Sequence, residues 1–492
     1  MSRPTPAPDD PTTGTTTTSS TNTTEQPWSF ATAQVHAGEQ AEGGFGARIP
    51  PIYLTAGFVF DDFEQARARF AGDDDGYTYS RIGNPSCTAL ERRLAGLERG
   101  DEAILVGSGQ AAVTVALLGL LQAGDHLLST SSIYEGSRGL FRENFARFGI
   151  EVDFVDDATD LQQWRDLLRP TTRALFAESI PNPKNDLVDL RAVADLAHSH
   201  GIPLVVDNTL ATPYLLRPIE HGADVVVHSA SKFLSGHGAS LGGVVVTAGT
   251  FDFGARPDAF PHLNEPSRAL HGASYVQRFG PRAYVEFTRH VIAARLGPTI
   301  SPVNAFLIQQ GVETLSLRVA QHSRNALALA QWLEQQPEVL SVDHAGLASS
   351  PSAALARRYL PDGAGSVFAF TLSGGEPAAR RFFDAVTLFS RMTHVGDVRS
   401  LVLHPATTTH AQRTEAERRA AGIWPGLLRL SVGIEDVRDL LADLERGLAA
   451  VRAGTPRTPA PPPQTQTHAQ SHTQTHAPAP ASAPASSAVA AA

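Results

Sequence analysis

Short apolar runs alternate with longer amphipathic stretches through most of this chain. Several runs are continuously apolar rather than alternating, which is typical of strands covered by helices on both faces. Helical patterns separate most of them, notably over residues 84–100, 109–124 and 187–201. This alternation predicts an α/β fold with a largely parallel sheet. The runs occupy residues 103–107, 126–130, 151–155, 173–179, 203–207, 224–228 and 242–247.

The pattern changes after residue 300. Residues 304–336 carry apolar positions at helical spacing and predict a helical connector. Apolar runs at 367–372, 388–396 and 427–435 predict strands, and residues 436–453 predict a final helix. We therefore expect a large domain over residues 28–300 and a smaller α+β domain over residues 301–453.

The two ends of the chain differ from this core in composition. Residues 1–27 are rich in Thr, Pro and Ser, and residues 454–492 in Pro, Ala and Thr. Segments with so little apolar surface cannot offset their ordering entropy by burial. We expect both to be disordered tails.

Composition narrows the class of protein. The net charge of −10 argues against nucleic acid or an anionic membrane as a partner. The single cysteine, Cys87, excludes an internal disulfide framework and zinc clusters built on thiolates, and we predict no metal site. No apolar run approaches the roughly 20 residues that span a bilayer, and the N-terminus does not resemble a signal peptide. The sequence predicts a soluble cytoplasmic protein.

Lys232 lies in a loop of small residues directly after the apolar run 224–228. It is one of only two lysines, with Lys184, among 40 Lys and Arg residues. A guanidinium stays protonated and cannot form a Schiff base, so an amine kept at a strand end indicates a catalytic residue. A lysine spared by chance in an arginine-rich composition is the alternative.

Asp207 ends the apolar run 203–207 and is expected at the sheet edge where α/β proteins bind ligands. Ribose binding, metal binding or helix capping would each place an aspartate there. Together with Lys232, however, Asp207 completes a pair that pyridoxal phosphate (PLP) requires. The lysine forms an imine, and the acid holds the pyridine nitrogen protonated.

A small-residue turn, GSGQAA at residues 107–112, opens the predicted helix 109–124. Small residues let the backbone approach a phosphate, and the free N–H groups of a helix start favour an anion. A generic turn is the alternative. Ser229 and Ser231 flank Lys232 with further hydroxyl donors, or simply cap the strand end.

Four other side chains stand out. Tyr134 follows a strand, where its ring is suited to stack on a cofactor or to pack in the core. Tyr79 and Arg81 lie in the polar loop YTYSRIGNP, an unusual setting for core residues. Arg429 interrupts an apolar strand, which calls for a carboxylate partner from the protein or from a substrate.

These pieces, in this order, resemble the Cys/Met-metabolism family of PLP-dependent enzymes over about residues 30 to 452. The motifs are YTYSRIGNPS, GSGQAA, ESIPNP, VVDNT, SASK, SLVLHPATTTH and LRLSVGIED. The resemblance implies PLP fold type I, the aspartate-aminotransferase-like fold. It also implies a homo-oligomer, in which two subunits form a dimer with shared sites and dimers usually pair into a tetramer. The N-terminal segment of the large domain would contact the neighbouring subunit.

The resemblance assigns roles residue by residue. Lys232 is then the Schiff-base lysine and Asp207 the partner of the pyridine nitrogen, with Tyr134 stacked on the ring. Tyr79 and Arg81 reach the phosphate of a neighbouring subunit. The remaining roles are phosphate binding by Ser108, Gly109, Gln110, Ser229 and Ser231, contact with the phenolic oxygen by Asn182, and substrate-carboxylate binding by Arg429 with Ser400 beside it.

Within the family, VHAGEQ, KFLSGHGASLGG, the long segment 250–300 and GDVRSLVLHPATTTH are most similar to enzymes that act on O-acetylhomoserine. The implied reaction replaces acetate with sulfide or a thiol to give homocysteine, in methionine biosynthesis. O-succinylhomoserine sulfhydrylase, cystathionine γ-synthase and γ-lyase activities of the same family are alternatives, and a non-enzymatic scaffold is a distant one. Ser231 replaces a common threonine and keeps the hydroxyl. Glu135 replaces a commonly small residue, and the sequence does not fix where its carboxylate points.

Overall fold

The computed structural model describes residues 28–38 and 46–454. Residues 1–27 and nearly all of 454–492, which we predict to be disordered tails, lie outside the described residues. The described chain up to Gly454 falls in one compact unit that contains two sheets. The proposed division into domains at residue 300 therefore stays a prediction. None of the helices described is long and apolar enough to cross a membrane.

The larger sheet has seven strands in the order β1-β7-β6-β5-β4-β2-β3. Neighbouring strands are parallel except at β7, which is antiparallel to both β1 and β6. The predicted largely parallel sheet is confirmed, and all seven apolar runs become strands. Their bounds are β1 Glu102–Val106, β2 His126–Thr130, β3 Glu151–Val155, β4 Thr172–Glu178, β5 Leu204–Asp207, β6 Val225–His228 and β7 Gly243–Thr247.

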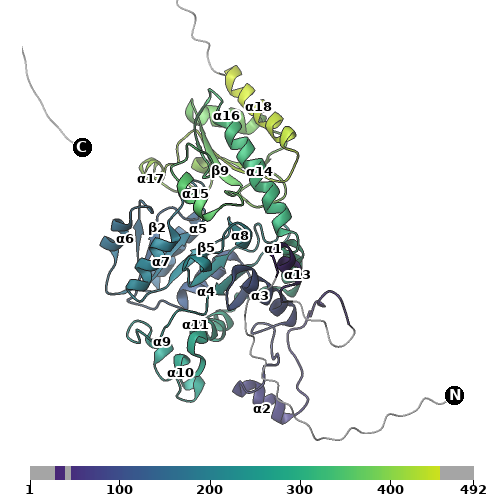
Figure 1. Cartoon of the computed structure of the whole chain (residues 1–492), viewed down its shortest axis with the longest axis vertical. Helices are drawn as coiled ribbons and strands as arrows, with labels where there is room; N and C mark the ends of the chain where they lie inside the picture. Colours follow the sequence, from purple (N-terminus) through teal and green to yellow (C-terminus); the bar gives the residue numbers. More distant parts are fainter. Residues whose placement is uncertain (1–27, 39–45, 455–492) are drawn as a thin grey trace, which may run out of the picture. The chain divides into compact units, whose positions relative to one another are not determined.

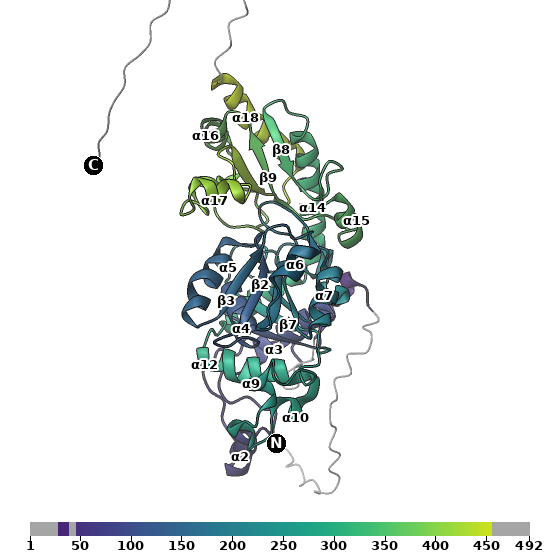
Figure 2. The ribbon, with the colours of Figure 1, turned by 90° about the vertical axis from the view of Figure 1, so that its left-hand side faces the viewer.

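Both faces of the central part of this sheet are buried, which explains why strands such as β6 and β7 are continuously apolar. Successive side chains of a strand point to opposite faces. In β6, for example, Val226 packs into one core, whereas Val225 and Val227 pack into the other. Figure 2 shows α6 and α7 on one side of the sheet and α5 on the other.

The helices of the large-sheet region include those that connect and cover these strands (Figures 1 and 2). They are α1 Phe30–His36, α2 Phe63–Ala71, α3 Pro85–Glu98, α4 Gly109–Leu118, α5 Glu135–Gly139, η1 Leu140–Phe145, α6 Leu161–Leu167, α7 Leu190–Ser199, α8 Thr212–Leu215, η2 Pro218–His221, α9 Pro261–Asn264, η3 Arg268–Leu270, α10 Tyr275–Phe279, η4 Gly280–Arg282, α11 Ala283–Phe287, η5 Thr288–Ala293, α12 Ala294–Leu296 and α13 Pro302–Val312.

The smaller sheet has five strands in the order β10-β11-β12-β9-β8. Its core is formed with α14, α16 and α18, which Figure 1 shows grouped around β9. The strands are β8 Val339–Asp343, β9 Val367–Leu372, β10 Ser390–Arg391, β11 Leu401–Leu403 and β12 Leu427–Ser431. The helices are α14 Leu315–Leu333, α15 Ala353–Tyr359, α16 Gly375–Ala385, η6 Pro405–Thr407, α17 Glu415–Ala420 and α18 Val437–Gly454.

Several predicted elements differ in length. The connector 304–336 is two helices, because the chain breaks at Glu313 and Thr314, where Glu313 pairs with Arg93 of α3 at 3.0 Å. The helix predicted over 109–124 stops at Leu118. The strand predicted over 388–396 shrinks to the two residues of β10, and the one predicted over 427–435 ends at Ser431. Strands β8 and β11 were not predicted.

Candidate active site

A cavity of about 420 Å³ lies at the carboxyl ends of β4, β5 and β6. Parallel strands of an α/β sheet bind ligands at this edge. The chain around Thr393–Val395, together with Thr409 and Arg429, contributes the part of the lining that comes from the smaller sheet. Predicted site residues in the lining are Ser108, Gly109, Gln110, Tyr134, Asn182, Asp207, Ser229, Ser231, Lys232 and Arg429.

Lys232 is held in the turn that follows β6. Its backbone N–H donates to the Ser229 carbonyl at 3.1 Å, and its Nζ lies 3.0 Å from Nδ1 of His394. Burial, reinforced by the positive charge of Arg429, lowers the pKa of Lys232 to about 8. A sizeable fraction of the amine is therefore neutral near physiological pH and able to accept a proton.

Asp207 and Glu178 end adjacent strands in register with each other. One oxygen of Asp207 accepts hydrogen bonds from the Thr209 N–H at 2.9 Å and the Thr209 hydroxyl at 2.5 Å. Burial and then the charge of Asp207 raise the pKa of Glu178 well above its usual value. Burial also raises the pKa of Asp207, but Thr209 and the charge of His228 oppose that rise.

The start of α4 and the turn before Lys232 meet closely. Ser108 caps α4 by accepting a hydrogen bond from the Ala111 N–H at 3.1 Å. A Cβ atom on Gly109 would lie 2.5 Å from Cβ of Ser229, so only glycine fits there. The first N–H groups of a helix have no partner within the helix and carry its positive dipole end. Hydroxyl and N–H donors from both turns therefore form a cradle suited to an anion.

The Tyr134 loop is fixed from two sides. The Tyr134 N–H donates to Oε1 of Glu178 at 2.6 Å, and Gly136 leaves no room for a Cβ between the tyrosine ring and Gln110. Glu135 is absent from the cavity lining. Its carboxylate instead forms a bidentate ion pair with Arg413, with a distance of 2.9 Å from Nε to Oε1. The Glu135 carboxylate, whose orientation the sequence did not fix, therefore points away from the cavity.

Three polar side chains in the lining, those of Asn182, His394 and Arg429, have an atom without a protein partner, which in His394 is Nε2. Oδ1 of Asn182 and Nε of Arg429 are buried and make no hydrogen bond. Arg429 donates only to the backbone carbonyls of Thr393 and His394, at 2.9 and 3.3 Å. No carboxylate of the described residues pairs with this buried guanidinium, although such a charge requires one. An exogenous carboxylate is the natural partner.

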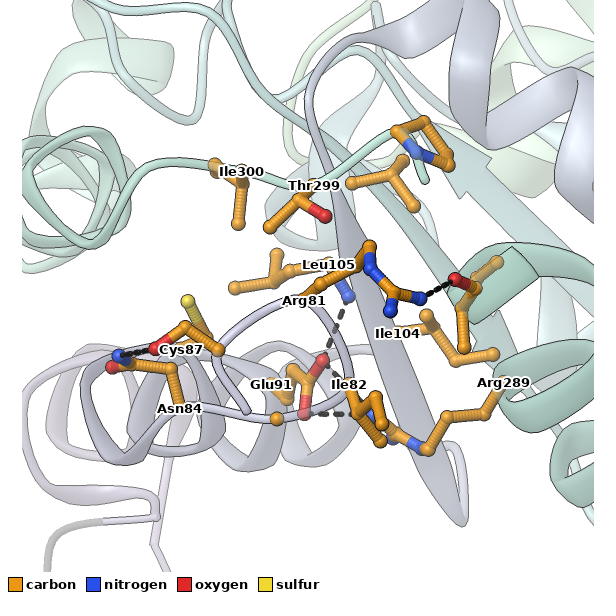
Figure 3. Close-up of a pocket in the computed structure, with 16 residues that line it drawn as sticks. Arg81, Ile82, Asn84, Cys87, Glu91, Ile104, Leu105, Arg289, Thr299 and Ile300 are labelled. Carbon is orange, nitrogen blue, oxygen red and sulfur yellow. Dashed lines mark hydrogen bonds and ion pairs between the residues drawn. The ribbon is translucent and has the colours of Figure 1, made fainter. Parts of the chain in front are cut away.

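Three predicted residues lie elsewhere. Tyr79 and Arg81 stand outside the cavity, on the surface, with the Arg81 guanidinium 5.5 Å from the Tyr79 ring centroid. Figure 3 shows Arg81 near Thr299, and its guanidinium donates to the Ala294 carbonyl. Ser400 is fully buried, accepts the Gly433 N–H at 2.8 Å and donates to Glu435 at 2.9 Å, so its place beside a substrate stays a prediction.

Sequence reasoning missed His394, Glu178 and Thr209. Glu178 is the first residue of the motif ESIPNP and Thr209 is the last residue of VVDNT. Both therefore lie in motifs that carry the family resemblance, and this could have identified them. His394 had no such signal, because it falls in a segment that we expected to be a strand.

The residues that line the cavity fit pyridoxal phosphate. This cofactor requires donors and acceptors that the lining supplies, namely a lysine, a carboxyl group, an anion cradle, an aromatic ring and an unpartnered amide. Arg429 adds a buried cation to the lining.

Comparison with known proteins agrees with this geometry. Residues 31–449 match the family described as Cys/Met metabolism PLP-dependent enzymes. The chain is 43% identical over 433 residues to an O-acetyl-L-homoserine sulfhydrylase of Corynebacterium glutamicum, covering 87% of this chain and 99% of that protein. It is 42% identical over 422 residues to a homocysteine synthase of Schizosaccharomyces pombe, covering 85% and 98%.

A solved structure is also similar. It is that of a putative O-acetylhomoserine (thiol)-lyase of Campylobacter jejuni, which contains N'-pyridoxyl-lysine-5'-monophosphate. The TM-score is 0.83 and the identity 34%, over 86% of this chain and 100% of that one. This likeness and the family match establish PLP fold type I.

Proposed function

Because this chain belongs to the family of Cys/Met metabolism PLP-dependent enzymes, we propose that it catalyses γ-replacement on O-acetyl-L-homoserine. Sulfide or a thiol displaces acetate, and L-homocysteine is the product with sulfide. The observation that carries this proposal is the single cavity that joins Lys232, Asp207 and the unpaired guanidinium of Arg429. The names of the relatives point to the acetyl ester and to homocysteine.

The residues that hold the cofactor follow from the lining. Lys232 would bind PLP covalently, Asp207 would accept a hydrogen bond from its ring nitrogen, and Tyr134 would stack on its ring. Asn182 would contact the phenolic oxygen, and the phosphate would be held by the cradle, through Ser108, Gly109, Gln110, Ser229 and Ser231. When bound, PLP withdraws electrons and stabilises negative charge on the substrate carbon.

The side chains then divide the work on the substrate. Arg429 holds the α-carboxylate, which orients the amino acid in the cavity. The Nζ atom of Lys232, when neutral, removes protons from the α- and β-carbons in turn. Its lowered pKa of about 8 supports that role. The part of the lining that comes from the smaller sheet helps to exclude water around Lys232.

The proposal includes a homo-oligomer with shared sites, a dimer that pairs into a tetramer, in the cytoplasm. Tyr79 and Arg81 lie outside their own cavity, and in the proposed dimer they reach the phosphate of another copy, where Arg81 exchanges its hydrogen bond to the Ala294 carbonyl for the phosphate. The segment that carries them, residues 46–83, includes α2, which both views show apart from the two sheets (Figures 1 and 2). It exposes 90% of Val59, 78% of Phe63 and 79% of Phe70. Exposed apolar groups on this scale support burial against another subunit.

A product assay tests the reaction. The purified enzyme is mixed with O-acetyl- or O-succinylhomoserine, and with sulfide, cysteine or no nucleophile. We expect homocysteine and acetate from the acetyl ester with sulfide, and none from the Lys232→Ala variant, which also loses the absorbance of the bound cofactor. Cystathionine from cysteine, or 2-oxobutyrate without a nucleophile, as the main product would show the γ-synthase or γ-lyase activity instead. A faster reaction with O-succinylhomoserine than with O-acetylhomoserine would indicate O-succinylhomoserine sulfhydrylase activity.

A further inference from the structure

The side chain of Thr209 joins two parts of the cavity that have different proposed roles. Thr209 lies in the loop after β5 and is part of the cavity lining. Its hydroxyl donates to Oδ1 of Asp207 at 2.5 Å and accepts a hydrogen bond from the Ser229 N–H at 2.8 Å. Asp207 ends β5, and Ser229 directly follows the parallel neighbour β6. One hydroxyl therefore links the ends of two adjacent strands, and the proposed function gives it no role.

The direction of these hydrogen bonds does not depend on whether Asp207 is ionised. A backbone N–H only donates, so the Thr209 oxygen accepts from Ser229 and its single proton is available for Asp207. Oδ1 of Asp207 also accepts the Thr209 N–H at 2.9 Å. This oxygen is therefore an acceptor even if the other oxygen of the carboxyl group carries a proton.

The two donors of Thr209 fix how the Asp207 carboxyl group is turned. Rotation about the last bond of an aspartate side chain is only weakly restrained by itself. Both donors bind Oδ1, and none of the described residues donates a hydrogen bond to Oδ2. Oδ2 is therefore the oxygen left for a ligand. The backbone contact alone is a common aspartate turn, whereas the hydroxyl adds a donor that is itself held by the neighbouring strand end.

Ser229 connects the other end of this link to the lysine and to the anion cradle. Its carbonyl accepts the Lys232 N–H at 3.1 Å. Its Cβ lies against Gly109 at the start of α4, where a Cβ on the glycine would be only 2.5 Å away. A hydrogen bond that holds the Ser229 backbone therefore bears on the position of both groups.

We propose that Thr209 is a positioning residue for the cofactor site. Its hydroxyl leaves Oδ2 of Asp207 free for the ring nitrogen and holds that carboxyl group at a fixed spacing from the turn of Ser229 and Lys232. The ring-nitrogen partner and the phosphate cradle stand at the two ends of this link, so a change in the spacing weakens both contacts together. This inference rests on the proposed roles of Asp207 and of the cradle.

Thr172 offers a matched control. It is the first residue of β4, at the end of that strand away from the cavity. Its hydroxyl accepts the Arg169 N–H at 2.8 Å and lies 2.8 Å from Nδ1 of His126, so it too joins a backbone N–H to a side chain. Thr172→Val removes a similar pair of hydrogen bonds without touching Asp207. It therefore measures what such a loss does to the fold alone.

The experiment compares Thr209→Val, Thr209→Ser, Thr172→Val, Asp207→Ala and the Thr209→Val/Asp207→Ala double variant. Valine keeps the shape of threonine without the hydroxyl, and serine keeps the hydroxyl. The dissociation constant of PLP is measured on each holoenzyme by ultrafiltration, and thermal unfolding is followed in parallel. We expect Thr209→Val to weaken PLP binding about tenfold, because the Ser229 N–H loses its partner and Asp207 loses a donor.

The other variants should bind PLP differently. We expect Thr209→Ser and Thr172→Val to stay within about twofold of the wild type, since the first keeps the link and the second lies outside the cavity. When Asp207 is already Ala, the hydroxyl has no carboxyl group to hold, and Thr209→Val should add less than about a twofold loss.

Each other outcome has a definite meaning. Unchanged PLP binding in Thr209→Val, an equal loss in Thr209→Ser or Thr172→Val, or an undiminished loss in the double variant would overturn the inference and leave the role of Asp207 intact. Unchanged binding in Asp207→Ala would overturn the proposed role of Asp207, and the inference with it. If Thr209→Val does not fold, Thr209→Ala is held to the same expected loss relative to Thr209→Ser, from which it differs only by the hydroxyl.

Discussion

Nδ1 of His394, from the chain between β10 and β11, lies 3.0 Å from Nζ of Lys232. Burial, and then the positive charge of Lys232, lowers the pKa of His394 to about 4. The ring is therefore neutral at physiological pH and is able to accept a hydrogen bond from the amine. The smaller sheet thus supplies a group that orients the lysine of the larger one.

Removal of this acceptor should slow turnover. We expect His394→Phe to lower kcat about fivefold, the effect of losing one hydrogen bond of about 1 kcal/mol, with little change in KM. His394→Asn keeps an acceptor and should recover part of the loss. Steady-state kinetics with O-acetylhomoserine and sulfide measures both. Equal kcat values in the Phe variant and the wild type would show that the contact has no role in turnover.

Lys232 should destabilise the cofactor-free protein at neutral pH. Its folded-state pKa of about 8 lies below the unfolded value of 10.5, so folding favours the neutral amine. The resulting loss of unfolding free energy is complete below pH 8 and disappears as the pH rises toward 10.5. It is at most about 3 kcal/mol, and partial exposure of the side chain makes it smaller. Lys232→Met should therefore raise the free energy of unfolding at pH 7, by an amount that shrinks at alkaline pH. Denaturant titrations at several pH values test this, with Lys184→Met as the control outside the cavity.

The ion pair between Glu135 and Arg413 should matter for both stability and cofactor binding. Arg413 is largely buried, with 13% of its side chain exposed, and Glu135 follows Tyr134, which we propose to stack on the cofactor. Glu135→Gln leaves this guanidinium unpaired, and we expect a loss of about 1–3 kcal/mol of unfolding free energy together with weaker PLP binding. The double variant Glu135→Gln/Arg413→Gln should lose less than the sum of the single effects. Additive losses would contradict a direct coupling.

Asp443 of α18 should stabilise the smaller sheet in a pH-dependent way. Its carboxylate accepts hydrogen bonds from the N–H groups of Thr387, Leu388 and Phe389, at 2.9 to 3.1 Å. Burial raises the pKa of Asp443, but these hydrogen bonds outweigh it and the net pKa is lowered. The stabilisation is complete above the unfolded pKa of 3.8 and is lost as the pH falls through the lowered value.

The corresponding variant is Asp443→Asn. We expect it to cost about 2 kcal/mol of unfolding free energy at pH 7 and clearly less near pH 3, as measured by denaturant titration. Asp436→Asn, in the exposed turn before α18, is the control and should change the free energy little. A cost that does not depend on pH would mean that the carboxylate charge is not the source of the stabilisation.

Complementation tests the shared site. If Arg81 serves another subunit, a mixed oligomer of Arg81→Ala and Lys232→Ala chains contains some sites with both residues intact. We expect each variant alone to be nearly inactive and the mixture, after dissociation and reassociation, to regain up to about a quarter of the wild-type activity, since random pairing leaves one intact site in half of the dimers. A mixture without activity would indicate that Arg81 acts on its own cavity.

Much of the larger sheet follows from the sequence because its signal is local. All seven apolar runs become strands, and the inner ones are marked most clearly, since a strand buried on both faces must be largely apolar. The smaller sheet was harder to predict. Strand β8 is only half-buried, and β10 and β11 have two and three residues, so neither length nor periodicity marks them.

The sequence alone determined the order of the strands along the chain, and therefore which residues stand at their carboxyl ends. Lys232, Asp207, the turn at 107–112 and Tyr134 were found for that reason. Only the tertiary structure decided which side chains that are distant in the sequence come into contact. His394 contacts Lys232, 162 positions away in the sequence, and Arg413 contacts Glu135, 278 positions away. Hydrophobic periodicity reports on burial within one element. Contacts between distant side chains depend instead on how the elements pack, which no local pattern records.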